Sequence, residues 1–101
     1  MTRLIVSSTA EADTTEILEY LEREAGARVA ADYGRRFRLT IERLVDLPET
    51  GAPRSLLGAD TRIAIVSPYV LIYDYARKDD TLSLLRILHG RRNITNKLLR
   101  E

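Results

Sequence analysis

The first half of the chain carries apolar residues at the three- and four-residue spacing of amphipathic helices. The first apolar stripe consists of Ile17, Leu18, Leu21 and Ala25. Glutamates fill many of the positions between them, so the opposite side of this helix is acidic. Gly26 favours the end of the helix, since glycine adopts the positive φ angle of a C-terminal cap without strain. Near the start, we expect the hydroxyl of Ser8 or Thr9 to accept a hydrogen bond from a free backbone N–H.

A second helical stripe follows Gly26 and ends at Pro48. Its apolar positions are Ala30, Tyr33, Phe37, Ile41, Leu44 and Val45. Arginines occupy much of the remaining surface of this segment. Because the connection between the two helices is very short, we expect an antiparallel hairpin in which an acidic helix packs beside a basic one.

The hydrophobic period changes after residues 48–60, a stretch predicted to be a loop from its prolines and glycines. Short apolar runs and alternation predict strands at 62–66, 69–75 and 82–88, and another at 3–7. The last three strands are joined by brief turns, which connect only antiparallel neighbours. The segment 93–100 is predicted to be either a short helix or an extended tail.

The order of these elements predicts an α+β fold, β-α-α-β-β-β. A sheet with one buried face needs a cover, and the helix hairpin is the only one that the pattern offers. We therefore expect the hairpin to pack on a mostly antiparallel four-stranded sheet. With 101 residues, the chain is expected to form a single domain over 1–101.

Composition excludes several classes of site. The chain has no cysteine and a single histidine, His89, so neither a disulfide framework nor a zinc site is expected, and we predict no metal or cofactor. No apolar run resembles a signal peptide or a membrane span, which favours a cytoplasmic protein. Charge is divided unevenly: residues 1–50 carry seven arginines against ten acids, and residues 51–101 carry nine basic residues against five acids. The basic half permits contact with nucleic acid or an acidic protein segment.

Four strings of residues resemble the ParE/RelE superfamily of bacterial toxins. They are IERLVDLP at 41–48, ETGAPR at 49–54, YVLIY at 69–73 and LRILHGRR at 85–92. The last string is the most specific, and together with the first strand and acidic helix the likeness spans nearly the whole chain. The fold that this resemblance implies agrees with the one derived from periodicity.

The resemblance implies the toxin component of a type II toxin–antitoxin system, associated with growth arrest and plasmid stabilisation. It also implies a cognate antitoxin, encoded by the adjacent gene, whose partly disordered segment folds on the toxin in a hetero-oligomer. Two mechanisms occur in the superfamily. ParE-like members inhibit DNA gyrase by binding it, and RelE-like members cleave messenger RNA on the ribosome.

The residues favour the ParE-like mechanism. A metal-independent ribonuclease needs a base or orienting group, cations and usually an acid, which RelE-like toxins draw from Lys, Arg and a late Tyr or His. Here the tail after Arg92 contains no tyrosine or second histidine, and Lys78 and Lys97 are the only lysines. We therefore expect a protein-binding inhibitor rather than an enzyme. Its target-binding residues are predicted to be Arg86, His89, Arg91, Arg92 and Lys97.

Two alternatives stay open at this point. If the chain is a ribonuclease, its catalytic residues are predicted to be Arg54, Arg62, Arg86, His89 and Arg91, because an imidazole exchanges protons near neutral pH. A third hypothesis is a non-toxic module that only binds an antitoxin.

Some of these residues also have structural interpretations. For His89, donation of a hydrogen bond to a backbone carbonyl is favoured over catalysis, and Arg54 is expected to pin its loop rather than to contact a partner. Tyr69, Tyr73 and Tyr75 share one strand face, where core packing with hydroxyl groups at the rim is favoured over stacking on RNA bases.

Overall fold

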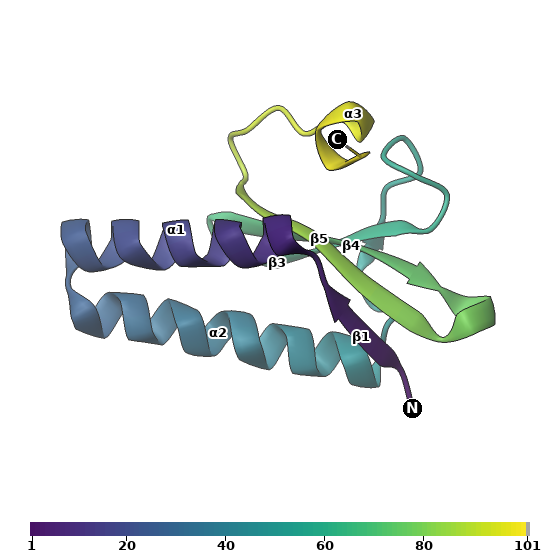
Figure 1. The fold of residues 1–101 in the computed structure, drawn as a ribbon, viewed down its shortest axis with the longest axis horizontal. Helices are drawn as coiled ribbons and strands as arrows, with labels where there is room; N and C mark the ends of the chain where they lie inside the picture. Colours follow the sequence, from purple (N-terminus) through teal and green to yellow (C-terminus); the bar gives the residue numbers. More distant parts are fainter. Residues whose placement is uncertain (101) are drawn as a thin grey trace.

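The computed structural model describes residues 1–100 and confirms the α+β fold. Figure 1 shows two long helices lying side by side against a sheet. The elements in chain order are β1 (Arg3–Val6), α1 (Ser8–Ala25), α2 (Ala27–Asp46), β2 (Ala52–Pro53), β3 (Thr61–Val66), β4 (Tyr69–Ala76), the 3-10 turn η1 (Arg77–Asp79), β5 (Thr81–His89) and α3 (Asn96–Arg100).

The sheet has five strands where four were predicted. Its order is β1-β5-β4-β3-β2, with β1 parallel to β5 and every other pair antiparallel. The additional strand, β2, contains only two residues and lies inside the predicted loop 48–60. A two-residue strand that includes a proline leaves no hydrophobic period to detect, which is why the pattern missed it.

The two faces of the sheet have different covers. The helix hairpin covers one face, and the core between them contains Ala10, Phe37, Leu44, Val66, Tyr69, Leu71, Tyr73, Leu82, Leu84 and Ile87. On the other face, Ile72, Leu88 and Leu99 form a second apolar cluster. Leu99 belongs to α3, which lies over the sheet on the side away from α2 (Figure 1). The C-terminal segment is thus a short helix, and it supplies a second cover that the sequence pattern did not predict.

Helix α1 begins one residue earlier than predicted. Its N-cap is Ser7, not Ser8 or Thr9, and the Ser7 hydroxyl accepts a hydrogen bond from the Ala10 N–H at 2.9 Å. The same hydroxyl donates to the Leu85 carbonyl at 2.8 Å. Ser7 is the cap because it is the position where the chain leaves β1 beside β5. At the other end, Gly26 caps α1 with φ of 99°, as predicted.

Strand β5 contains one extra residue relative to β4. Ile72 lies opposite Arg86 whereas Tyr73 lies opposite Leu84, so Leu85 is bulged. The bulge lets Leu84 and Ile87 both face the helix layer, although an unbroken strand would place them on opposite faces.

The tyrosines of β4 pack in the core, as predicted. Tyr69 and Tyr73 are buried under the hairpin, and Tyr75 packs at the margin of the same cluster. The Tyr73 hydroxyl donates to the Pro48 carbonyl at 2.8 Å and accepts from the Gly51 N–H at 3.0 Å. These two bonds fix the chain where it enters β2.

Candidate target-binding surface

The end of β5 forms a tight turn that presents His89, Arg91 and Arg92 to solvent. The Gly90 N–H donates to the Pro68 carbonyl at 2.8 Å, and the Arg92 N–H donates to the His89 carbonyl at 3.0 Å. The His89 Nδ1 accepts from the Arg91 N–H at 3.1 Å. His89 is therefore an acceptor from the backbone rather than the predicted donor to a carbonyl.

An aromatic stack supports this turn from below. The His89 ring lies edge-on to Tyr69 with centroids 5.8 Å apart. Tyr69 in turn packs edge-on to Tyr33 and Phe37, each at 5.7 Å. Burial is the main cause that raises the pKa of the Tyr69 phenol above its ordinary value of 10, with smaller contributions from Tyr33 and Tyr20. The phenol is thus a neutral platform that holds the imidazole at the end of β5.

A groove of about 390 Å³ runs between this turn and helix α1. We call it the α1–β5 groove. Its walls combine both signs of charge with aromatic and apolar surface: Asp13, Glu16, Ile17, Glu19, Tyr20, Arg23, Tyr69, Ile87, Leu88, His89 and Arg92. Such a mixture, with a half-exposed tyrosine at its rim, suits contact with a folded protein surface. A site for RNA would instead be a uniformly basic cleft.

Arg86 lies just behind this groove and is held by Asp13. The Arg86 Nε and Nη2 donate to the two carboxylate oxygens of Asp13 at 2.7 and 2.9 Å, with side chains only 13% and 11% exposed. Asp13 also accepts from the Ile87 N–H at 3.0 Å, beside the bulge and beyond the end of β1. This pair joins α1 to β5 and fixes where the groove lies.

Two of the other predicted residues lie in or beside β2 and β3. The Arg62 Nη1 donates to the carbonyls of Glu49 and Gly51, each at 2.8 Å, so Arg62 secures the entry to β2. A hydrogen bond from Arg77 is the main cause that lowers the pKa of the Glu49 carboxyl. Arg54 is exposed, and its Nη1 donates to the Pro53 carbonyl at 2.8 Å rather than to a distant part of the loop.

The two lysines lie at separate places. Lys78 is exposed in η1, and Lys97 is exposed on α3. Of the five predicted target-binding residues, the structure therefore groups His89, Arg91 and Arg92 in one turn and places Arg86 behind them. Lys97 lies apart, on the helix that covers the other face of the sheet.

Sequence reasoning missed Asp13, Glu16, Glu19 and Tyr20 as parts of this surface. Asp13 carried a usable signal, because it stands at helical spacing from Ala10, Ile17 and Leu21, where an apolar residue is expected. An acid on the buried stripe of a helix requires a partner. The glutamates carried no such signal, since exposed acids on a helix are ordinary.

A protein-family model for the ParE toxin of the type II toxin–antitoxin system parDE matches residues 4–94. The chain belongs to the ParE toxin family. The match runs from β1 through the turn that follows β5, and it ends before α3.

Individual relatives agree with this assignment. The chain is 33% identical over 88 residues to toxin ParE1 of Caulobacter vibrioides, covering 87% of this chain and 88% of that protein. The fold is similar to that of the chromosomal ParDE system of P. aeruginosa, with a TM-score of 0.73, 19% identity, and coverage of 88% of this chain and 96% of the other. It is also similar to the isolated E. coli RelE toxin, with a TM-score of 0.62, 14% identity and coverage of 92% and 88%.

These solved structures share the fold of this ParE-family toxin at low sequence identity. Within residues 1–100, no helix combines the length and apolarity needed to cross a membrane.

Proposed function

We propose that this ParE-family toxin inhibits DNA gyrase by binding it and is neutralised by a cognate antitoxin. The proposal rests on the exposed turn that contains His89, Arg91 and Arg92 and borders the α1–β5 groove. The protein that carries this turn is a member of the ParE family. A rigid turn that projects cations beside aromatic surface has the composition of a protein-binding site, where arginine and tyrosine are enriched.

The arrangement of the ribonuclease candidates supports the same choice. Arg62 is engaged with two backbone carbonyls, and Arg86 is engaged with Asp13. Arg54 follows β2 and lines a hollow that also includes Gly90, and its Nη1 donates to the Pro53 carbonyl. A metal-independent ribonuclease needs its acid, base and cations around one phosphate. Two of the cations in this set are thus engaged in structural contacts within the fold, which favours inhibition by binding.

Arg86 and Asp13 have a supporting role in this proposal. Their ion pair fixes α1 against the end of β5 and so sets the relative positions of Tyr20, His89 and Arg92. Lys97 is left outside the target surface because it projects from α3.

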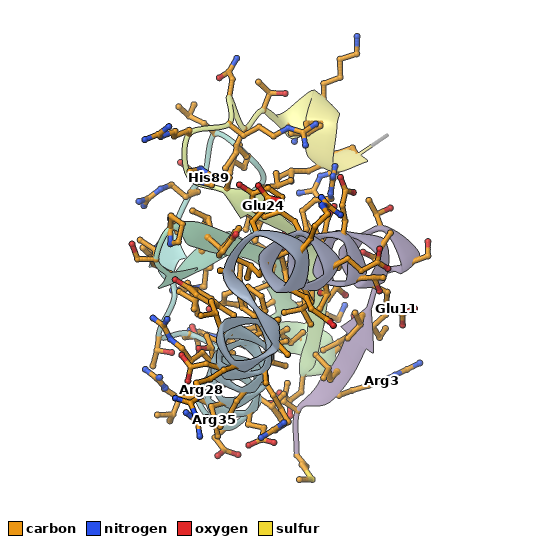
Figure 2. The ribbon with its side chains drawn as sticks, turned by 90° about the vertical axis from the view of Figure 1, so that its left-hand side faces the viewer. Arg3, Glu11, Glu24, Arg28, Arg35 and His89 are labelled. Atoms are coloured by element: carbon orange, nitrogen blue, oxygen red, sulfur yellow. The ribbon has the colours of Figure 1, made fainter. Side chains whose placement is uncertain are left out.

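The test is a supercoiling assay with purified gyrase and three proteins: the wild type, Arg91→Glu/Arg92→Glu and Arg35→Glu/Arg38→Glu. The control pair changes the same total charge on the exposed surface of α2. Figure 2 shows Arg35 projecting from α2, away from His89. We expect the wild type and control to inhibit supercoiling equally, and the Arg91/Arg92 variant to need about tenfold more protein, since losing interface charges weakens binding on this scale.

If the wild type does not inhibit supercoiling even at stoichiometric excess, the proposal is wrong. If the wild type instead produces codon-positioned cuts in translated messages, detected by primer extension, the ribonuclease alternative replaces it. Equal loss in both double variants assigns the effect to net charge and not to this turn.

A further inference from the structure

The two rims of the α1–β5 groove carry opposite charges. Helix α1 contributes Glu16 and Glu19, and the turn after β5 contributes Arg92, all three with exposed side chains. None of the three forms an ion pair with any residue that the structure describes. Asp13, the remaining acid of the groove, is already neutralised by Arg86. The charges on the two rims are therefore available to groups that the fold itself does not supply.

The surface between the rims is apolar and aromatic. Ile17 lines it from α1 and Tyr69 lines it from β4, and both pack in the core under the helix hairpin. Tyr20 stands on the α1 side and is the only exposed tyrosine or phenylalanine within residues 1–100. The Arg23 guanidinium lies 5.9 Å from the centre of the Tyr20 ring. An apolar floor between charged rims is the arrangement found in protein interfaces, where exposed tyrosines are favoured contacts.

Two contacts fix the separation of the rims. The Asp13–Arg86 pair joins α1 to β5, and the Gly90 N–H holds the turn by donating to the Pro68 carbonyl at 2.8 Å. From Asp13 to Arg23, the α1 side of the groove extends about 15 Å along the helix axis. The groove thus presents its charges at defined positions before any partner binds, which lowers the cost of ordering them on binding.

We propose that the α1–β5 groove receives a segment of gyrase that is basic on one flank and acidic on the other. An arginine or lysine on the flank that faces α1 pairs with Glu16 and Glu19, and an acid on the other flank pairs with Arg92. An apolar side chain between them covers Ile17 and contacts Tyr20. Such charge complementarity fixes the orientation in which the segment docks. The inference rests on the proposed function, because it names the part of the target that the same surface recognises.

The test is a charge series on the α1 rim: the wild type, Glu16→Gln/Glu19→Gln and Glu16→Lys/Glu19→Lys. Binding to immobilised gyrase is measured by biolayer interferometry, and inhibition is measured by the supercoiling assay. We expect the dissociation constant to rise about threefold in the glutamine variant, which loses two exposed ion pairs. In the lysine variant it should rise about tenfold or more, because attraction becomes repulsion.

The matched control is Glu22→Lys/Glu42→Lys, which makes the same change in net charge. Both glutamates are exposed, and neither lines the groove nor forms an ion pair within residues 1–100. This control should bind at least as tightly as the wild type. Urea midpoints establish that the variants are folded, and the glutamine variant alone decides the test if the lysine variant is less stable.

The order of the series distinguishes the inference from an ordinary solvated acidic face on α1. If Glu16 and Glu19 only stand beside cations that contact an acidic surface of gyrase, removing them should tighten binding, and the lysine variant should bind best. That order, or equal binding across the series, overturns the inference. So does an equal loss in the control, which would assign the effect to net charge.

The outcome is separable from that of gyrase inhibition itself. A wild type that neither binds nor inhibits gyrase contradicts the proposed function, and the inference fails with it. A wild type that inhibits gyrase, with a dissociation constant that the charge series leaves unchanged, contradicts only the recognition of a basic flank by α1.

Discussion

Asp13 is the residue on which the position of helix α1 depends most directly. Its carboxylate accepts three hydrogen bonds, two from Arg86 and one from the Ile87 backbone, and lies almost out of solvent. We predict that Asp13→Ala lowers the free energy of unfolding by about 3 kcal/mol, because it removes the counter-charge of a nearly buried guanidinium. Urea denaturation at neutral pH measures this difference.

The matched control is Asp32→Ala, which removes the exposed ion pair between Asp32 and Arg35 on α2. Its expected cost is below about 0.5 kcal/mol, since exposed pairs are screened by water. If the two substitutions cost the same, the Asp13 pair does not anchor α1 in the way that its geometry indicates.

Tyr73 makes stability depend on alkaline pH. Burial is the main cause that raises its pKa above the ordinary value of 10, opposed by the Gly51 N–H and the charge of Arg62. In the unfolded chain the phenol ionises at about 10. The folded state therefore resists ionisation, so the contribution is complete below pH 10 and is lost as the pH rises through the folded pKa.

We accordingly predict that the free energy of unfolding falls as the pH rises above about 10. In Tyr73→Phe it should fall less steeply and start about 1–2 kcal/mol lower at neutral pH, since the Gly51 N–H loses its acceptor. Urea titrations at several pH values provide both quantities. An unchanged slope in the variant would show that other groups cause the alkaline loss.

At the scale of elements, the junction of β1, α1 and β5 depends on one hydroxyl. Ser7 caps α1 and also bonds the Leu85 carbonyl, whereas Ser8 is exposed in the first turn. We predict that Ser7→Ala costs about 1–2 kcal/mol and that Ser8→Ala changes stability by less than about 0.5 kcal/mol. Thermal unfolding of the two variants makes the comparison, and a larger effect at Ser8 would restore the cap position that the sequence favoured.

The elements that the sequence predicted are those with a long hydrophobic period. Both helices and β3, β4 and β5 have enough apolar positions for the period to be read from the chain alone. Strand β2 and the role of α3 could not be obtained this way. Strand β2 is fixed by hydrogen bonds that Gly51 makes with the distant Tyr73 and Arg62 side chains, and α3 by packing of Leu99 on the far face of the sheet. The Leu85 bulge is likewise a product of strand pairing.

The candidate site was only partly predictable for a related reason. His89, Arg91 and Arg92 are neighbours in the chain and therefore remain neighbours in the fold. Arg86 was identified by its charge, but the chain does not reveal that Asp13, 73 residues away, engages it. Contacts across such separations follow from how α1 is placed beside β5.

At the scale of the whole molecule, the helix hairpin separates two surfaces with different chemistry. The α1–β5 groove combines acids, aromatics and the turn at His89, whereas the surface between α2 and β3 carries Arg36 and Arg43. The uneven charge of the two chain halves does not describe this division, because Arg36 and Arg43 belong to the acidic half of the sequence. The charge of a surface in the folded protein therefore does not follow the net charge of the sequence half that supplies it.

This separation predicts that toxicity depends on the turn at His89 and not on the surface between α2 and β3. Cells induced to express Arg36→Glu/Arg43→Glu should stop growing as cells with the wild type do, because the variant keeps its target surface. Cells carrying Arg91→Glu/Arg92→Glu should continue to grow, because the target surface is lost. Growth curves of induced cultures, with Arg35→Glu/Arg38→Glu as the charge-matched control, distinguish the two. If both variants are harmless, or both stop growth, toxicity does not depend on the turn at His89 in the way that this separation predicts.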